Sequence, residues 1–461
     1  MRSFSASVAL IVLCVLPRPV SAERLSFRGE TMGTYYSIVV EAPEGTDSDE
    51  LEDAIEACLR KVNQQMSTWD PESQISQFNR FQKLEWFAVD PEFAAVVQES
   101  IRIHELSGGA FDPTVSPLID LWGFGDRREK RIPSDAEVDQ ARSRVGMHHI
   151  TVRHHPPGLR KDIAGVQLNL SAIAKGYGVD AVAAVLTRRG LDSWVVDIGG
   201  EDRAGQPKPD GQGWRIGIEK PDGGFHKLIS LLQTSIATSG DYRNNYVIDG
   251  QTFSHTIDPA TGRPLLHPPT SVSVLHNSCM TADAWATAMM VLGPDRGLQV
   301  AERQNLNVMF LLAEESGGLT EKSHGVFAQL PVFDPENPDA AMQVPAFTVD
   351  SPGAVAPQFS DPEDAQDDPT PGAEKESGLA SWLTPMLAAG GIFLLAVIGM
   401  AVGVMFNRRE LQGSCGGLAS LPNSEGMSVC DLCTKPKTDC SNPEVRAKYL
   451  AMEAGEKNSE Q

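Results

Sequence analysis

A predominantly apolar segment without any charged residue, Leu383–Phe406, constrains this sequence more than any other feature. It is long enough to cross the hydrocarbon core of a bilayer as one helix. Arg408 and Arg409 follow at once, which by the positive-inside rule places the C-terminal side in the cytoplasm. We therefore expect a single-pass protein of the inner (cytoplasmic) membrane, with a transmembrane helix over residues 383–406.

The N-terminus is typical of a secretory signal peptide. Arg2 precedes a short apolar run, Val8–Leu16, and Val20-Ser21-Ala22 offers the small residues that a signal peptidase requires. We predict that residues 1–22 are cleaved off after Ala22; the alternative is an uncleaved anchor. The signal places the following domain in the periplasm, in agreement with the topology inferred from the two arginines.

Residues 23–332 predict a single mixed α+β domain, because helical patterns and short strand-like runs occur along its length. Asp249-Gly250 lies between two apolar runs and predicts a β-hairpin turn. Residues 333–380 are rich in Pro, Asp and Glu and predict a flexible acidic linker. The expected helices are Ser48–Met66 and Pro91–Ser107, and the expected strands are Tyr36–Val40, Trp194–Ile198, Trp214–Ile218, Ser271–Leu275 and Asn307–Leu312.

The formal net charge of -22 argues against a nucleic-acid-binding protein, which needs a basic surface to neutralise phosphates. It identifies no partner, because much of the acid lies in the linker. Cys58 and Cys279 fall in the periplasmic domain. We expect them to be small buried residues; the alternative is a disulfide.

Asp283 and Thr287 are four residues apart in a segment that predicts a helix, so they share one face. A carboxylate and a hydroxyl are hard oxygen ligands, which suit Mg²⁺. The alternative is an acidic residue that only complements the helix dipole.

A second helix start follows Ser171, where Lys175 and backbone N–H groups could cradle a phosphate, although the sequence is not a Walker loop. The alternative is a helix cap followed by a surface lysine. His255 lies in a segment rich in Thr and Asp and could act as a base or be structural.

Eight short segments interrupt apolar runs with polar and glycine residues: 31–34, 66–69, 109–114, 169–176, 197–200, 238–242, 255–262 and 281–288. In this order, they resemble the motifs of the FAD:protein FMN transferases, the ApbE-like flavin transferases. The resemblance covers about residues 27–315. It implies an enzyme that uses FAD as substrate and Mg²⁺ as cofactor.

The resemblance also implies roles for individual residues. The flavin and adenine pocket would be lined by Met32, Trp69, Ala110, Phe111 and Asp112. Asn169, where the family often has Asp, and Lys175 would contact FAD, while His255 and Ile257 would lie beside the pyrophosphate and the flavin. The backbone carbonyl of Ala172 would join Asp283 and Thr287 around Mg²⁺. His255 would take the proton of the incoming hydroxyl.

The reaction so implied transfers FMN from FAD to a Thr or Ser hydroxyl of an acceptor protein and releases AMP. The demands on the enzyme are mainly positioning and electrostatic stabilisation. The alternatives are a non-catalytic periplasmic FAD-binding or storage protein and an FAD pyrophosphatase.

The C-terminal tail, residues 407–461, carries Cys415, Cys430, Cys433 and Cys440 on the reducing side of the membrane, where cysteines indicate metal ligands rather than disulfides. Iron and zinc both remain open. About residues 385–440 resemble the NqrM-like maturation factors of the Na⁺-translocating NADH:quinone reductase (Na⁺-NQR). That resemblance implies Na⁺-NQR subunits as acceptors and iron delivery by the tail.

Overall fold

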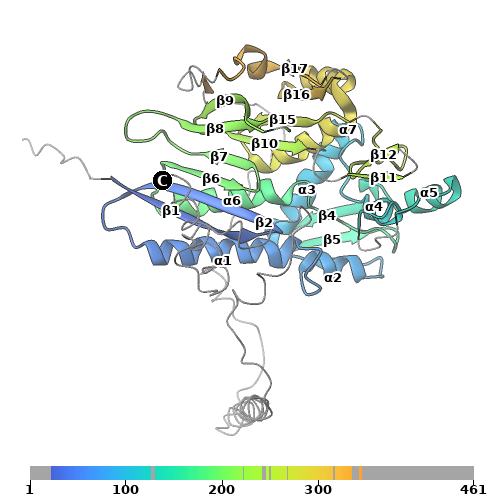
Figure 1. Ribbon diagram of the computed structural model, residues 1–461. Helices are drawn as coiled ribbons and strands as arrows, with labels where there is room; N and C mark the ends of the chain where they lie inside the picture. Colours follow the sequence, from blue (N-terminus) through green and yellow to red (C-terminus); the bar gives the residue numbers. More distant parts are fainter. Residues whose placement is uncertain are drawn as a thin grey trace, which may run out of the picture. The chain divides into compact units, whose positions relative to one another are not determined.

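Figure 1 shows the computed structural model, which describes residues 22–125, 130–221, 223–240, 245–248, 251–266, 268–314, 317–334 and 342–344. The chain divides into two compact units after Asp367, and every residue of the second unit lies outside the described residues. The predicted signal peptide up to residue 21, most of the linker, the membrane helix and the cysteine tail therefore lie outside them too. In the part of the chain that is described, no helix combines the length and the apolar character needed to cross a bilayer.

An eight-stranded sheet in the order β1-β2-β6-β7-β10-β15-β16-β17 forms the centre of the first unit, and all neighbouring strands in it are antiparallel. The strands are β1 (Ala22–Thr31), β2 (Thr34–Pro43), β6 (Trp194–Ile198), β7 (Glu201–Ala204), β10 (Ser235–Gly240), β15 (Ser271–His276), β16 (Asn307–Ala313) and β17 (Leu319–His324).

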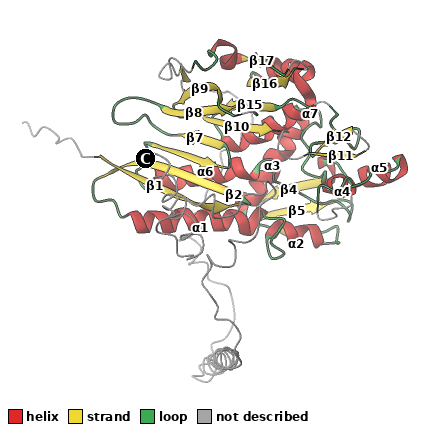
Figure 2. Cartoon of the chain, in the orientation of Figure 1, coloured by secondary structure: helices red, strands yellow, loops and turns green. Residues whose placement is uncertain are grey.

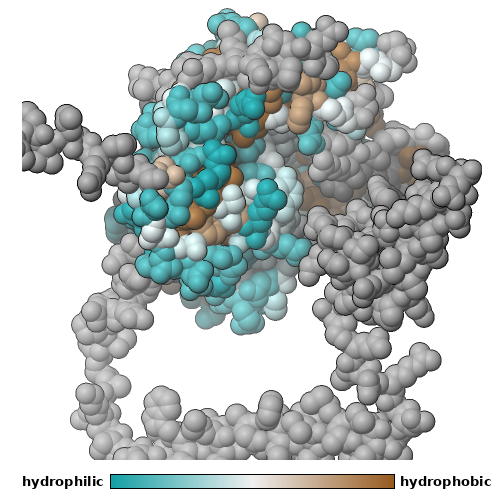
Figure 3. Space-filling view, turned by 60° about the vertical axis from the view of Figure 1, so that its left-hand side comes forward, coloured by the Kyte–Doolittle hydropathy of each residue, from teal (hydrophilic) through white to brown (hydrophobic). Residues whose placement is uncertain are grey.

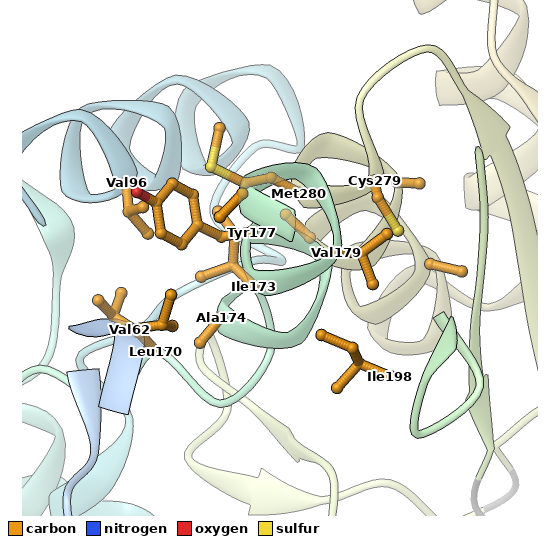
Figure 4. Close-up of a cluster of buried hydrophobic side chains, with 14 of the residues drawn as sticks. Val62, Val96, Leu170, Ile173, Ala174, Tyr177, Val179, Ile198, Cys279 and Met280 are labelled. Atoms are coloured by element: carbon orange, nitrogen blue, oxygen red, sulfur yellow. The ribbon is translucent and has the colours of Figure 1, made fainter. Parts of the chain in front are cut away.

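Four long helices pack together with one face of this sheet (Figures 1 and 2). They are α1 (Ser48–Met66), α3 (Pro91–Leu106), α6 (Ala174–Arg188) and α7 (Cys279–Gln304). Figure 4 shows α6 at the centre of this core, with Tyr177 and Val179 among side chains from neighbouring elements. Two helical segments meet within α7 at Gly293, whose positive φ of 66° interrupts the helix just before Pro294.

The opposite face of the sheet packs against a small sheet of β8 (Trp214–Glu219), β9 (Phe225–Leu231) and β18 (Met342–Val344). Strand β16 shows how the two cores are built: Val308 and Phe310 enter the helix-side core, whereas Met309 and Leu311 enter the other. Because both faces of β16 are covered, its sequence is a continuous apolar run and does not alternate between apolar and polar residues.

A smaller apolar cluster joins α4 (Ser116–Leu121), α5 (Asp135–Arg142) and the segment of β12 and β13. The indole Nε1 of Trp122 donates a hydrogen bond to the carbonyl of Gly262 at 2.9 Å, which ties this cluster to the 255–262 motif. The other described elements are α2 (Gln74–Arg80), β3 (Phe87–Ala88), β4 (Ile150–His154), β5 (Pro157–Lys161), β11 (Asn245–Ile248), β12 (Gln251–Ser254), β13 (Ile257–Asp258), β14 (Arg263–Pro264) and the 3₁₀ helices η1 (Met147–His149) and η2 (Gly325–Gln329).

The α+β class predicted for residues 23–332 is confirmed over residues 22 to about 330. Every helix and strand predicted by its bounds within residues 23–332 is present, whereas the predicted membrane helix lies outside the described residues. Strands β11 and β12 pair as the hairpin predicted around Asp249-Gly250, two residues that are themselves not described. Cys58 and Cys279 are free, buried thiols, as expected. Figure 3 shows a mainly hydrophilic surface over the described residues of one face, interrupted by small hydrophobic patches.

Candidate functional site

A pocket of about 820 Å³ opens where the starts of α6 and α7 meet the ends of several strands. Its walls come from the 110–115 loop, the turn between β6 and β7, strands β8 and β10, and β13. This volume is within the range for cofactor-sized ligands.

The N-terminal part of α7 places the two predicted metal ligands at this pocket. Ser278 caps the helix through its side chain, which accepts a hydrogen bond from the N–H of Thr281. Asp283 is 3% exposed, and Thr287 follows one turn later, with its Oγ1 3.3 Å from Oγ of Ser239 on β10. The side chains of Asp283 and Thr287 therefore face the same cavity, as their spacing predicted.

The starts of α6 and α7 touch at Gly176. Its N–H donates to Oδ2 of Asp283 at 3.0 Å. A Cβ at this position would lie 2.3 Å from the carbonyl oxygen of Cys279 and 2.8 Å from Cβ of Asp283, so only glycine permits this approach. The preceding residue, Lys175, is thereby held beside the same carboxylate.

Lys175 forms ion pairs with two carboxylates of the pocket. Its Nζ lies 2.5 Å from Oε2 of Glu201 and 3.8 Å from Oδ1 of Asp283. Burial by itself lowers the pKa of Lys175, but these two carboxylates outweigh it and hold that pKa above its ordinary value. The ammonium therefore stays charged. Burial raises the pKa of Glu201 to about 8 and also raises that of Asp283, although Lys175 opposes both shifts.

More carboxyl groups line the pocket around Lys175 than its single positive charge can neutralise. Asp197 and Asp202 are cross-strand partners on β6 and β7 and line the same pocket. Burial raises the pKa of both carboxyl groups, and for Asp202 the charge of Asp197 adds to it. A second cation would relieve this excess. Oxygen donors from Asp283, Thr287 and the Ala172 carbonyl are chemically suited to Mg²⁺, so the residues present fit that ion.

On another wall of the pocket, a hydrogen bond connects the loop before α4 to the segment before α6. Asp112 accepts hydrogen bonds from the N–H and the hydroxyl of Thr114, forming a local turn. The N–H of Asn169 donates to the carbonyl of Pro113 at 2.8 Å, and its Oδ1 accepts from the N–H of Ser171 at 3.0 Å. The side chain of Asn169 thus shapes the turn that leads to Lys175.

Asp180 holds the start of α7, and the sequence analysis did not single it out. It is fully buried on α6 and accepts hydrogen bonds from the N–H groups of Cys279 and Met280 at 3.0 and 3.1 Å. Its Oδ1 is also 2.6 Å from Nη1 of Arg203, which balances the charge. The carboxylate therefore caps the helix that carries Asp283.

The structure brings most of the predicted site residues together. The pocket is lined by Ala110, Phe111, Asp112, Asn169, Ala172, Lys175, His255, Ile257, Asp283 and Thr287. Met32 and Trp69 are not among its lining residues: Met32 packs against the helix-side core, and Trp69 is 82% exposed. Cys415, Cys430, Cys433 and Cys440 lie outside the described residues.

Glu201 is one of the pocket residues that the sequence analysis missed. Its position directly after the 197–200 motif was the available signal. The ion pair of Glu201 with Lys175 depends on a contact between β7 and α6 that the sequence pattern does not show.

Comparison with known proteins agrees with this geometry. The model of the ApbE family matches residues 32–310. The FAD:protein FMN transferase of Vibrio cholerae is 42% identical over 317 residues, covering 68% of this chain and 93% of the relative. That of Escherichia coli K12 is 34% identical, covering 65% and 88%.

Two solved structures share the fold. The flavin transferase ApbE from Vibrio cholerae superposes with a TM-score of 0.61 at 42% identity, covering 68% of this chain and all of that one. The apo form of the Pseudomonas stutzeri flavinyl transferase ApbE gives a TM-score of 0.62 at 36% identity, covering 67% and 97%.

Fold, pocket and relatives together define the class predicted from the sequence, the FAD:protein FMN transferases. The chain belongs to the ApbE family. Its residues 404–452 match a second family, described as (Na⁺)-NQR maturation NqrM, which confirms the other predicted resemblance.

Proposed function

We propose that this protein transfers FMN from FAD to a Thr or Ser hydroxyl of an acceptor protein, with Mg²⁺ as cofactor and AMP as the second product. The observation that carries the proposal is the meeting of two helix starts at Gly176, which holds Lys175 against Asp283 and Glu201 in a cofactor-sized pocket. Helix N-termini with an added cation are suited to a pyrophosphate.

Residues on different walls of the pocket have different roles in this proposal. Lys175 orients the pyrophosphate through its fixed positive charge, and Ala110, Phe111 and Asp112 contact the ring systems of FAD. Asp283, Thr287 and the Ala172 carbonyl would hold Mg²⁺, which when bound supplies charge neutralisation at the pyrophosphate oxygens. His255 and Ile257 belong to the segment near β13 that forms another part of the lining.

The reaction is a displacement at phosphorus. The acceptor oxygen forms a bond to the FMN phosphorus, the bond from that phosphorus to the AMP oxygen breaks, and His255 takes the hydroxyl proton. No covalent enzyme intermediate is needed, because positioning and electrostatics account for most of phosphoryl-transfer catalysis.

The test incubates the full chain with FAD, Mg²⁺ and an acceptor domain, and measures the acceptor's mass gain and flavin fluorescence. Asp283→Ala should lower transfer by about a hundredfold to a thousandfold, as expected for loss of a major electrostatic element. Asp295→Ala is the matched control, because Asp295 lies on the same helix, is 88% exposed and forms only an ion pair with Lys322 among its described contacts.

The outcomes separate the alternatives. FAD binding without transfer by the unmodified protein would indicate a storage protein. Release of FMN and AMP without acceptor labelling would indicate a pyrophosphatase. Equal activity of Asp283→Ala and Asp295→Ala would remove Asp283 from the site.

We further propose that the acceptors are subunits of Na⁺-NQR and that the tail delivers iron to the same complex through Cys415, Cys430, Cys433 and Cys440. The NqrM match at residues 404–452 supports this assignment. Iron content of the purified full chain should fall when Cys430 and Cys433 are both replaced by Ser, while transfer activity stays unchanged. Unaltered iron content would reject the metal role.

The proposed localisation is the inner membrane, with the transferase domain in the periplasm and the tail in the cytoplasm. The support is the sequence: the N-terminal signal, the apolar run Leu383–Phe406 and the arginines after it. Protease added to intact spheroplasts should digest the transferase domain and spare an epitope at the C-terminus; the reverse pattern would overturn the topology.

A further inference from the structure

Strand β8 has one edge that no described strand occupies. The small sheet has the order β18-β9-β8, so β8 pairs with β9 on one side only. In an antiparallel pair, alternate residues direct their N–H and C=O groups away from the partner strand. Such an edge is a template for pairing with another chain.

This edge borders the reaction pocket. The five consecutive residues Arg215–Glu219 all line the pocket. Successive side chains of a strand point to opposite faces, so a cavity touching only one face would be lined by alternate residues. Lining by every residue indicates that the backbone edge itself runs along the pocket, which also contains Lys175 and His255.

The strand is held firmly enough to act as a template. Trp214 and Ile218 are buried in the core between the small sheet and the main sheet, together with Ile229 from β9. An incoming segment therefore meets a strand that is already fixed, which lowers the ordering cost of binding.

Exposed aromatic side chains occur on the same pocket lining. Phe225 is 43% exposed and Tyr35 is 53% exposed, and both line the pocket. The ring of Phe225 lies over Gly217: a Cβ on Gly217 would lie 2.3 Å from Cε1 of that ring. These rings offer apolar contacts to the side chains of a bound peptide.

We propose that the acceptor polypeptide binds in an extended conformation as an additional strand along the edge of β8, so that its Thr or Ser hydroxyl enters the pocket beside Lys175 and His255. The inference rests on the proposed function and deepens it, because it specifies how the protein substrate is recognised. Main-chain hydrogen bonds supply affinity in this mode, and alternate side chains supply specificity.

The test uses the full chain, FAD, Mg²⁺ and a series of acceptor peptides, each N-methylated at one backbone position on either side of the acceptor residue. N-methylation removes one hydrogen-bond donor and blocks strand pairing there. Transfer efficiency, kcat/KM, should fall about tenfold or more at every second position and stay within about twofold at the positions between. The dissociation constant of FAD should not change, because the enzyme is the same throughout.

Other results would overturn the proposal. Uniform tolerance of N-methylation, or losses without the two-residue period, would exclude pairing with β8. Labelling of the whole acceptor domain but not of the unmodified peptide would show that a folded surface is recognised instead. If neither the domain nor the peptide is labelled, the failure lies in the proposed function itself.

Discussion

At Gly176, the addition of a single methyl group should strongly reduce transfer activity while the domain still folds. The alanine Cβ would lie 2.3 Å from the Cys279 carbonyl oxygen and 2.6 Å from its carbon, and both atoms belong to the backbone. Ordinary contacts of this kind are about 3.5 Å, so α6 and α7 must move apart by about 1 Å. This movement displaces Lys175 and Asp283 relative to each other.

The two effects of Gly176→Ala on stability oppose each other. Overpacking costs about 1–3 kcal/mol, whereas alanine gains about 1 kcal/mol of helix propensity over glycine. We expect a net loss of about 1 kcal/mol in the free energy of unfolding and a fall of a few degrees in Tm. Transfer should fall about a hundredfold, because a displacement of 1 Å has that effect on a positioned reaction.

Gly178→Ala, two residues later on the same helix, is the matched control. Its Cβ would meet Cε of Met32 at 2.5 Å, the far end of a flexible side chain, and Cδ1 of Ile198 at 3.2 Å. We expect transfer within about threefold of the unmodified protein, since Met can adopt other rotamers. Differential scanning calorimetry and the acceptor mass assay measure both variants. Unchanged kcat/KM in Gly176→Ala, or equal losses in both variants, would refute the reasoning.

Three further substitutions test other parts of the structure. Asp180→Asn should lower the free energy of unfolding by about 2 kcal/mol and reduce transfer, since a neutral side chain cannot balance Arg203 or cap α7 as strongly; urea unfolding and the transfer assay measure these losses. Burial lowers the pKa of Lys161 to about 8 from its ordinary value of 10.5. Between these two pH values the amine is therefore neutral in the folded protein but protonated in the unfolded chain. The stability of the unmodified protein relative to Lys161→Met should therefore rise between pH 8 and about 10.5, and a flat difference would contradict this. Although burial alone raises the pKa of Glu321, hydrogen bonds from His226, Lys227 and Ser323 bring it down to about 2. The stability advantage over Glu321→Gln, present above about pH 4.5, should be lost as the pH falls towards 2 in thermal melts.

Local patterns predicted several of the long helices and central strands, because the forces that determine them act over a few residues. The helix at Ser48–Met66 has the predicted bounds, and the strand predicted at Trp194–Ile198 is β6. Asp283 and Thr287 were predicted to share a face because helical periodicity alone determines this.

Long-range contacts could not be predicted in the same way. The pairing of β7 with both β6 and β10 places Glu201 beside the site, and no local signal specifies that order. The cap that Asp180 provides to α7 joins residues about a hundred positions apart. Strand β1, which pairs with β2 along its whole length, was also missed, since its alternating exposed and half-buried residues lack a strong apolar pattern.

The contact between α6 and α7 at Gly176 has a thermodynamic consequence for the whole domain. The groups that it brings together come from distant parts of the chain, so the pocket exists only when the domain is folded. A ligand that binds there selects the folded state and stabilises it by RT ln(1 + [L]/Kd), about 2.7 kcal/mol at a hundredfold excess over Kd. Saturating FAD should thus protect this domain from unfolding and proteolysis, which makes the substrate a stabiliser of the enzyme as well as a reactant.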